Sequence, residues 1–187
     1  MRKVSDIPVL IIGILLFLIS YNLDQPVNLF FKALKFPIFD VVFSVITNFS
    51  VVVMVMLLIP SLVFYKKNRK LIYALWLAFL ASLALAFVIK LIFLRQRPIE
   101  AFTYPFTNII SYSFPSMHAM VIFALLPILI KYLQKQKAFW LSFAFLAVFS
   151  RIYFGFHFLS DVVFGALSGH FVGNSLLKLY ESVKLWR

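Results

Sequence analysis

Long apolar stretches dominate this sequence and restrict the folds that are open to it. Each is near the roughly 20 residues that an α-helix needs to cross the hydrocarbon core of a bilayer. They are Ile7–Leu23, Val41–Tyr65, Leu71–Leu94, Ser116–Leu133 and Ala138–Phe156, with a weaker sixth, Asp161–Tyr180, that polar residues interrupt. Hydrophobic residues make up 64% of the chain and charged residues 13%, whereas soluble domains have about half and about a quarter. We therefore expect an all-α polytopic membrane protein in which residues 1–187 form one domain of six transmembrane helices.

The first apolar stretch follows a basic start and superficially resembles a secretory signal peptide. Its apolar run is long and no small-residue cleavage site follows it, so we expect it to remain as the first helix. The segment after it, Asp24–Asp40, mixes apolar and basic residues, and we expect it to lie along the outer interface between helices 1 and 2. The chain has no cysteine, which excludes disulfides and thiolate chemistry.

The formal net charge of +12 could suggest nucleic acid, but the distribution of the basic residues favours a membrane topology. With both termini assigned to the cytoplasm, twelve of the 18 Lys and Arg residues lie on the cytoplasmic side and six on the outer side. Cytoplasmic loops of membrane proteins carry such an excess. We therefore predict a multi-pass protein of the cell membrane, with membrane lipids as partners and no nucleic acid.

Three polar segments lie at the outer ends of the predicted helices, and KLIFLRQRP is the first. Lys90 and Arg97 are seven residues apart, about two helical turns, so a helix would place them on one face. Pro98 then disfavours further helix and leaves Arg97 at the rim. Arg95 lies off the shared face, and for it we expect only a snorkelling cation that anchors the helix end.

The second segment, SFPSMHAM, opens the fourth predicted helix. Pro115 followed by Ser116 predicts a helix start with Ser116 as the cap. A helix N-terminus offers free N–H groups and a positive dipole end to an anion. His118 lies in this first turn, where a histidine taken alone is more often structural than catalytic.

The third segment, SRIYFGFHFLSD, ends the fifth predicted helix and begins the sixth. Gly155 can break the helix, and Ser160 or Asp161 can start the next one. His157 and Asp161 are four residues apart, a spacing that lets a carboxylate hold one imidazole nitrogen and raise the basicity of the other. The predicted topology brings all three segments to the same membrane face, so we expect them to form one site.

The residue types of this site fit phosphate chemistry better than metal binding. Two histidines and one aspartate could form a metal triad, but Lys90, Arg97 and Arg151 nearby would repel a divalent metal. The same cations suit a tetrahedral oxyanion, because guanidinium groups contact phosphate bidentately. One imidazole backed by a carboxylate can be a nucleophile, and the other can protonate the leaving group. We therefore predict phosphoryl transfer without a metal or other cofactor.

The three segments resemble the three-part signature of the type 2 phosphatidic acid phosphatase (PAP2) superfamily, KxxxxxxRP, PSGH and SRxxxxxHxxxD. The first and third match fully; in the second, PSMH, Met117 stands where Gly is usual. The family's fold implies an integral-membrane lipid phosphatase, and its soluble haloperoxidase branch does not fit this apolar composition. Since a Gly can adopt conformations that Met cannot, Met117 is expected to affect the local backbone and the shape of the pocket mouth.

The resemblance also implies a role for each site residue. His157 attacks phosphorus and forms a phosphohistidine, Asp161 orients it, and His118 protonates the departing oxygen and later activates water. The phosphoryl oxygens are held by Lys90, Arg97, Arg151, Ser116 and the backbone N–H of Met117. A second SGH sequence, Ser168–His170, lacks the preceding Pro and puts His170 on the opposite helix face from Asp161, so we expect a polar contact between helices there.

The resulting prediction is a metal-independent lipid phosphate or diphosphate phosphatase with its active site on the extracytoplasmic face. Candidate substrates are a polyprenyl diphosphate, phosphatidylglycerophosphate, phosphatidic acid and a lipid A phosphate. The alternative is a phosphate-binding transporter or channel without hydrolytic activity, because basic residues within spans also mark ion paths. Against it, the charges lie at one level and no discontinuous helix pair is evident. A purely structural membrane protein leaves the triple motif unexplained.

Overall fold

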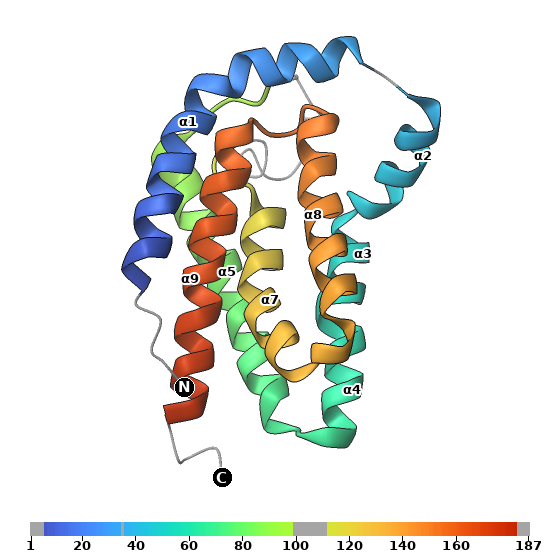
Figure 1. Ribbon diagram of the computed structural model, residues 1–187, viewed down its shortest axis with the longest axis vertical. Helices are drawn as coiled ribbons and strands as arrows, with labels where there is room; N and C mark the ends of the chain where they lie inside the picture. Colours follow the sequence, from blue (N-terminus) through green and yellow to red (C-terminus); the bar gives the residue numbers. More distant parts are fainter. Residues whose placement is uncertain (1–5, 35, 99–111, 183–187) are drawn as a thin grey trace.

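The computed structural model describes residues 6–34, 36–98 and 112–182 of the chain. All regular secondary structure in these ranges is helical, as the sequence predicts. Five of the basic residues counted above, Arg2, Lys3, Lys35, Lys184 and Arg187, lie outside them. The helices in Figure 1 are α1 (Asp6–Ala33), α2 (Pro37–Ile46), α3 (Phe49–Val53), a π-helical turn (Met54–Leu58), α4 (Ile59–Lys67), α5 (Lys70–Phe93), α7 (Met117–Tyr132), a 3₁₀ turn (Gln134–Gln136), α8 (Lys137–Tyr153) and α9 (Leu159–Ser182).

The prediction of six full-length spans is not confirmed. Within the described ranges, four helical stretches are long and apolar enough to cross a membrane, namely Ile7–Ala33, Phe49–Lys67, Lys70–Phe93 and Leu159–Ser182. The predicted spans Ser116–Leu133 and Ala138–Phe156 correspond to α7 and α8, which have 16 and 17 residues. At 1.5 Å per residue these helices are about 24 and 26 Å long, shorter than a hydrocarbon core of about 30 Å. The weak sixth candidate, in contrast, is a full-length helix.

The predicted span Val41–Tyr65 is wrong as a continuous helix. The chain leaves α2 at Ile46 and enters α3 at Phe49. Asn48 is the N-cap of α3, and its side-chain oxygen accepts a hydrogen bond from the backbone N–H of Ser50 at 2.9 Å. This cap makes a helix start in the middle of an apolar stretch, and it leaves the residue before it, Thr47, outside both helices.

Helix α1 bends at the start of the segment predicted to be interfacial. Pro26 lies inside the helix, where it lacks an N–H donor and its ring crowds the carbonyl one turn earlier. Beyond the bend, the last turns of α1 cross the upper end of the bundle, and the chain then descends into α2 (Figure 1). Much of Asp24–Asp40 therefore lies across one end of the bundle, as an interfacial segment would.

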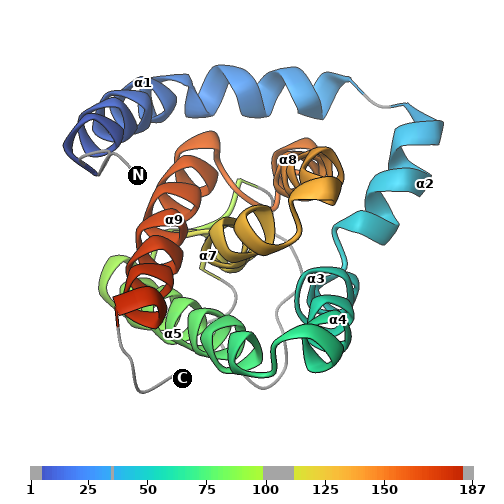
Figure 2. The same ribbon diagram turned by 60° about the horizontal axis from the view of Figure 1, so that its bottom comes forward.

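Helix α7 is the centre of the molecule. Seen from below, it is surrounded by α5, α8, α9 and the α3–α4 segment (Figure 2). Most of its side chains between His118 and Leu129 are buried, whereas α1 and α5 expose many large apolar side chains. Exposed apolar surface of this extent fits a lipid environment. A helix enclosed by protein does not need to match the bilayer thickness, which explains how α7 can be short.

A row of glycines lets α9 lie directly against α7. Gly165, Gly169 and Gly173 are spaced four residues apart and all are buried. A Cβ atom added to each would lie 2.7, 2.2 and 2.1 Å from the backbone oxygens of Ser116, Met120 and Ala124, in that order. Such distances are far below contact distance, so only glycine permits this approach. Small residues at every fourth position allow close helix packing in membranes, and here they fix the start of α7 relative to the start of α9.

Candidate active site

The three polar segments meet around one cavity of about 300 Å³. It lies where α5 and α8 end and where α7 and α9 begin. Its lining residues are Phe49, Lys90, Arg97, Met117, His118, Arg151 and His157. Six of the eight predicted site residues are in this lining, and the other two, Ser116 and Asp161, are fully buried next to it.

Two cations reach the cavity from the end of α5, although not by the predicted route. The helix ends before Leu94, whose φ of 46° is left-handed, so Lys90 and Arg97 do not share a helix face. Arg97 instead lies in the non-helical segment that follows, and its guanidinium donates to the carbonyl of Phe156 at 2.6 Å. The buried ammonium of Lys90 donates to the carbonyl of Tyr112. Both side chains are thus held in place by backbone acceptors.

The break between α2 and α3 provides contacts to His118 and Arg151. The carbonyl oxygen of Thr47 is 2.9 Å from Nε2 of His118 and 3.2 Å from the guanidinium of Arg151. The hydroxyl of Thr47 accepts a second hydrogen bond from Arg151 at 2.7 Å. The ring of Phe49 packs edge-on against the imidazole of His118, with 5.0 Å between the centroids. Thr47 was expected inside a transmembrane span, and it contacts two of the predicted site residues.

His157 lies in the connection between α8 and α9, where Gly155 has a left-handed φ of 70°. Its Nδ1 is 3.6 Å from a carboxylate oxygen of Asp161. Its Nε2 is 3.4 Å from the guanidinium of Arg97. A carboxylate near Nδ1 and a cation near Nε2 favour the tautomer with the proton on Nδ1 and the lone pair on Nε2. This ring nitrogen is the one available to attack an electrophile.

The surroundings of His157 also favour its neutral form. The imidazole is almost completely buried, and the guanidiniums of Arg97 and Arg151 and the ammonium of Lys90 are nearby. Burial first, and then these positive charges, hold the pKa of His157 well below its ordinary range. A neutral imidazole is the form that a histidine nucleophile requires.

Asp161 joins two of the motifs at the start of α9. The helix begins at Leu159, slightly earlier than the sequence suggests. One carboxylate oxygen of Asp161 accepts the N–H of Phe158 at 2.9 Å, which is the backward contact of a capping box. Its backbone carbonyl accepts the N–H of Ser116 at 3.1 Å, so the starts of α7 and α9 are directly bonded.

The start of α7 differs from the prediction in two respects. Ser116 occupies the N-cap position, but its side chain makes no capping bond. Its Oγ is buried and has no hydrogen-bond partner in the part of the chain that the structure describes, so it can serve an anion at this helix N-terminus. Met117 begins α7, and among the described non-glycine residues only Leu94 has a positive φ. The position of Met117 therefore needs no glycine-specific backbone.

Arg95 is not a lipid-facing anchor, and the prediction for it is wrong. Its guanidinium is 2.8 Å from Asp161 and 2.7 Å from Asp24, and it lies 4.1 Å over the ring of Phe158. Asp24, buried in α1, accepts the backbone N–H of Ser160 at 2.8 Å and its hydroxyl at 2.5 Å. Arg95 thus links two buried carboxylates, and Asp24 caps α9 from a different helix.

The second SGH sequence lies away from this cavity. Nε2 of His170 is 2.9 Å from the side-chain nitrogen of Asn174, one turn later on the same helix, and both residues line a separate cavity. Within residues 6–34, 36–98 and 112–182, no group of three or more His, Cys, Asp or Glu side chains is arranged to hold a metal ion.

The structure has a polar, histidine-containing cavity at one end of a helical bundle. Two solved structures have a similar fold. The fold is similar to that of a transmembrane PAP2-type phosphatidylglycerolphosphate phosphatase from Bacillus subtilis, with a TM-score of 0.72 and 23% identity over 95% of this chain and 98% of that one. It is also similar to LpxE from Aquifex aeolicus, with a TM-score of 0.68 and 26% identity over 83% of this chain and 95% of that one. No curated protein matches the sequence.

The family of this chain is shown by the match of its sequence to a family model. The model of the PAP2 superfamily matches residues 70–184, which is more than half of the chain and includes all three motifs. The chain belongs to the PAP2 superfamily and is a multi-pass membrane lipid phosphatase.

Proposed function

We propose that this phosphatase removes a phosphate from a lipid monoester or diphosphate at the extracytoplasmic membrane face, without a metal, through a phosphohistidine. The observation that carries the proposal is the arrangement of two histidines and three cations around one cavity at an end of the bundle. A phosphate dianion placed there would face Lys90, Arg97 and Arg151, each already held by a backbone or side-chain acceptor. Positioned charge of this kind is the main requirement of phosphoryl transfer.

In the first step, the Nε2 lone pair of His157 attacks phosphorus. An N–P bond forms as the P–O bond to the lipid breaks, and the departing oxygen takes a proton from His118. His118 enters this step as an imidazolium: its Nε2–H donates to the carbonyl of Thr47, and its Nδ1–H is the proton that it gives. Asp161 faces Nδ1 of His157 and stabilises the positive charge that develops on that ring.

In the second step, water replaces the histidine. The neutral His118 takes a proton from a water molecule as the water oxygen attacks phosphorus, and the N–P bond to His157 breaks. Inorganic phosphate leaves with the oxygen of that water, and both histidines return to their starting protonation states. The buried hydroxyl of Ser116 and the backbone N–H of Met117 are placed to donate to phosphoryl oxygens in both steps.

A lipid substrate suits the surroundings of the cavity. Phe49 and Met117 supply apolar lining beside the cations, and the helices around it expose apolar surface along which a lipid chain can approach. Phosphatidylglycerophosphate, the substrate named for the Bacillus subtilis protein, is accordingly the first candidate. Phosphatidic acid, a polyprenyl diphosphate and a lipid A phosphate offer the same terminal phosphate group.

The test is phosphate release from these four lipids by the purified protein in detergent, with and without a chelator. We expect release from at least one lipid, undiminished by the chelator, together with acid-labile phosphate trapped on the protein. His170→Gln serves as a control, because His170 lies at the separate cavity. Binding of every lipid without release would instead favour a phosphate-binding transporter or channel. Loss of activity in chelator that a divalent metal restores would contradict the metal-free mechanism.

The sidedness of the site rests on the positions of the basic loops. The last turn of α4 and the α4–α5 connection, which together contain Lys66, Lys67 and Arg69, lie at the end of the bundle opposite the crossing part of α1 (Figure 1). The positive-inside rule places that loop in the cytoplasm and the active site outside. Because the chain has no cysteine, single cysteines at Asn68 and Gln25 can report this directly. In intact cells an impermeant thiol reagent should label the Gln25 position and spare Asn68; the reverse pattern would invert the topology.

A further inference from the structure

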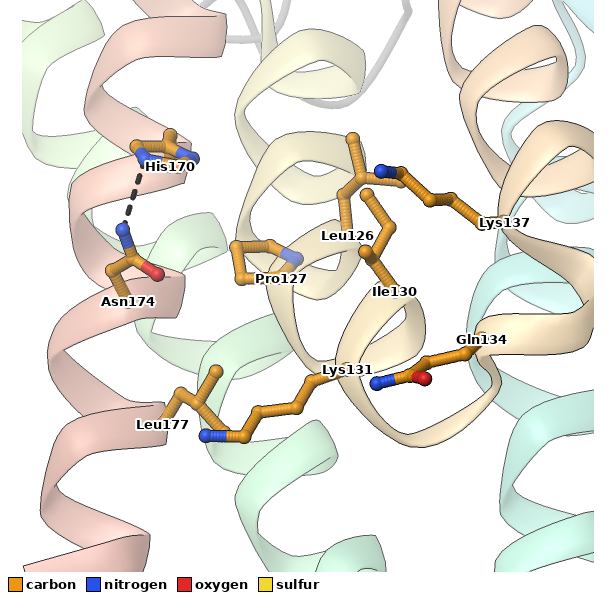
Figure 3. Close-up of a pocket in the computed structure, with 9 residues that line it drawn as sticks. All are labelled: Leu126, Pro127, Ile130, Lys131, Gln134, Lys137, His170, Asn174 and Leu177. Carbon is orange, nitrogen blue, oxygen red and sulfur yellow. Dashed lines mark hydrogen bonds between the residues drawn. The ribbon is translucent and has the colours of Figure 1, made fainter. Parts of the chain in front are cut away.

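A second cavity, of about 600 Å³, lies away from the active site, between the C-terminal half of α7, the start of α8 and the middle of α9 (Figure 3). Its volume is within the range of small-molecule binding sites. None of its lining residues lines the active-site cavity. Its polar lining consists of Lys131, Gln134, Lys137, His170 and Asn174. The phosphatase chemistry proposed above uses none of these side chains.

Polar groups line this cavity from two sides, and the lysines on the α7–α8 side carry positive charge. Lys137 projects from the start of α8 toward α7, and Lys131 lies at the end of α7 (Figure 3). Lys131 forms an ion pair with the partly exposed Glu181, so the pair contributes little net charge, whereas Lys137 adds a positive charge of its own. On the α9 side, His170 and Asn174 form a hydrogen-bonded pair that faces the same space.

The remaining walls are apolar. Leu126 and Ile130 of α7 lie next to Lys137, and Leu177 of α9 lies beside the ammonium of Lys131 (Figure 3). Since α7 ends at Tyr132 and the 3₁₀ turn follows, Lys131 and Lys137 belong to the adjoining ends of α7 and α8, and Leu126 lies more than one turn farther from that end. Two lysines at the helix ends, with aliphatic side chains beside them, match a molecule with an anionic head and an apolar tail.

We propose that this cavity binds an anionic glycerophospholipid from the leaflet opposite the active site. Its phosphate lies at Lys131 and Lys137, where it can replace Glu181 as the partner of Lys131, and one acyl chain lies along Leu126 and Ile130. A zwitterionic lipid would gain little from the lysines, and a free phosphate would leave the apolar wall without a partner. Basic pockets between membrane helices commonly hold such anionic head groups.

The experiment measures lipid that remains bound to the full-length protein after purification in detergent, by native mass spectrometry. The probes are phosphatidylglycerol, phosphatidylcholine and soluble glycerol 3-phosphate. The variant Lys131→Gln/Lys137→Gln removes both cavity lysines. Lys66→Gln/Lys67→Gln is the matched control, because it removes the same charge from the same end of the bundle at exposed residues outside the cavity.

We expect the wild type and the control to retain phosphatidylglycerol over phosphatidylcholine, and the cavity variant to lose at least about tenfold in affinity, given roughly fivefold for each lysine near an anionic surface. Ile130→Trp, which fills the apolar wall without changing charge, should also reduce retention. Turnover of nitrophenyl phosphate should stay within about twofold of wild type in each variant, which shows that the active site is folded.

Three results would overturn the proposal. An equal loss in both lysine variants would reduce the effect to general surface charge. Equal retention of phosphatidylcholine would leave only an apolar groove. Displacement of the lipid by glycerol 3-phosphate at similar concentration would make the ligand a free phosphate. Because binding is the readout, the proposal stands or fails separately from the proposed phosphatase mechanism.

Discussion

On one side of the active-site cavity His157 is surrounded by ionised groups, and on the other side His118 contacts a backbone carbonyl and a phenyl ring. The His157 side comprises Asp161, Arg95, Asp24 and Ser160, linked by ion pairs and hydrogen bonds of 2.5 to 2.8 Å. The His118 side comprises Thr47, Phe49 and Arg151, linked through one threonine.

This difference separates the two roles in the proposed mechanism. A nucleophile has to be aimed at phosphorus, and the ring of His157 faces, at 3.6 Å, a carboxylate that is itself held by Arg95 and by the start of α9. A proton donor has to exchange its proton in each cycle, and the neutral carbonyl of Thr47 orients His118 without fixing its charge. If the two sides have these different roles, variants of the two sides should lose activity in different ways.

The largest expected effect is on the His157 side itself. His157→Ala should reduce kcat by at least about 10³-fold on every substrate, because no atom remains that can form the N–P bond. Activity and acid-labile phosphate on the protein should disappear together. Residual turnover that is independent of the leaving group, with trapped phosphate still present, would show that another residue is the nucleophile. The two sides would then not have the roles assigned to them.

His118→Ala should show a substrate-dependent loss. An alkoxide that leaves phosphatidic acid needs a proton in the transition state, a contribution of roughly 10²–10⁴-fold, whereas a nitrophenolate or the phosphate of a diphosphate lipid is a better leaving group. We therefore expect a much larger loss of kcat/KM on phosphatidic acid than on nitrophenyl phosphate. Phosphoenzyme should also accumulate if water activation becomes limiting. Equal losses on all substrates would remove the proton-donor role from His118.

Arg95→Gln tests whether the ionic network positions His157. Loss of the guanidinium leaves two buried carboxylates without their shared cation, so Asp161 should hold the imidazole less firmly. We expect kcat to fall by about 10- to 100-fold, as supporting residues of active sites typically show, with KM nearly unchanged and partial recovery in Arg95→Lys. Arg69→Gln, in the α4–α5 connection at the opposite end, is the control. A rise in KM alone would mean that Arg95 binds substrate instead of positioning the nucleophile.

The two sides also differ in how far the sequence predicts them. Motif spacing and the predicted topology indicate one shared site for Lys90, Arg97, Arg151, His118 and His157, because each lies near the end of a predicted helix and all these ends are on one face. In the structure these residues line one cavity. The prediction for Arg95 is wrong because it assumes a helix that continues through residue 95, whereas α5 ends at Phe93. Asp24 could have been identified, since a chain with only six acidic residues has few partners for a partly buried arginine.

Other features could not be obtained from local pattern alone. The break at Thr47 lies within a long apolar run. The Asn48 cap is a local signal for it, but the contacts of Thr47 with Arg151 and His118 appear only in the folded structure. The short length of α7 depends on its enclosure by other helices, a property of the whole bundle. The glycines of α9 at every fourth position, in contrast, are plain in the sequence and indicate close packing. In the structure they account for the alignment of the starts of α7 and α9.

Thr47→Val tests the His118 side with a smaller change. The substitution keeps the shape of the side chain and the backbone carbonyl that orients His118, but it removes the hydroxyl 2.7 Å from Arg151. A hydrogen bond to a charged group contributes about 1.5–3 kcal/mol, part of which the remaining carbonyl contact can supply, so we expect a loss of about three- to tenfold in kcat/KM. Thr47→Ser, which keeps the hydroxyl, should stay near wild type. A loss in Thr47→Val that depends on the leaving group would show that the hydroxyl also controls His118.

The smallest effect is expected at Met117, which lies between the two sides. The motif comparison suggests that Gly belongs here, but Met117 has an ordinary helical backbone at the start of α7, and its N–H is available whichever side chain is present. Met117→Gly should therefore change turnover of nitrophenyl phosphate by no more than about twofold, while it lowers the stability of the helix start by about 1 kcal/mol. The Met side chain lines the cavity, so its removal should raise KM for lipid substrates relative to the soluble one. A large gain in kcat on nitrophenyl phosphate would mean that the side chain constrains the phosphate seat itself, and the two sides of the site would then be coupled through Met117.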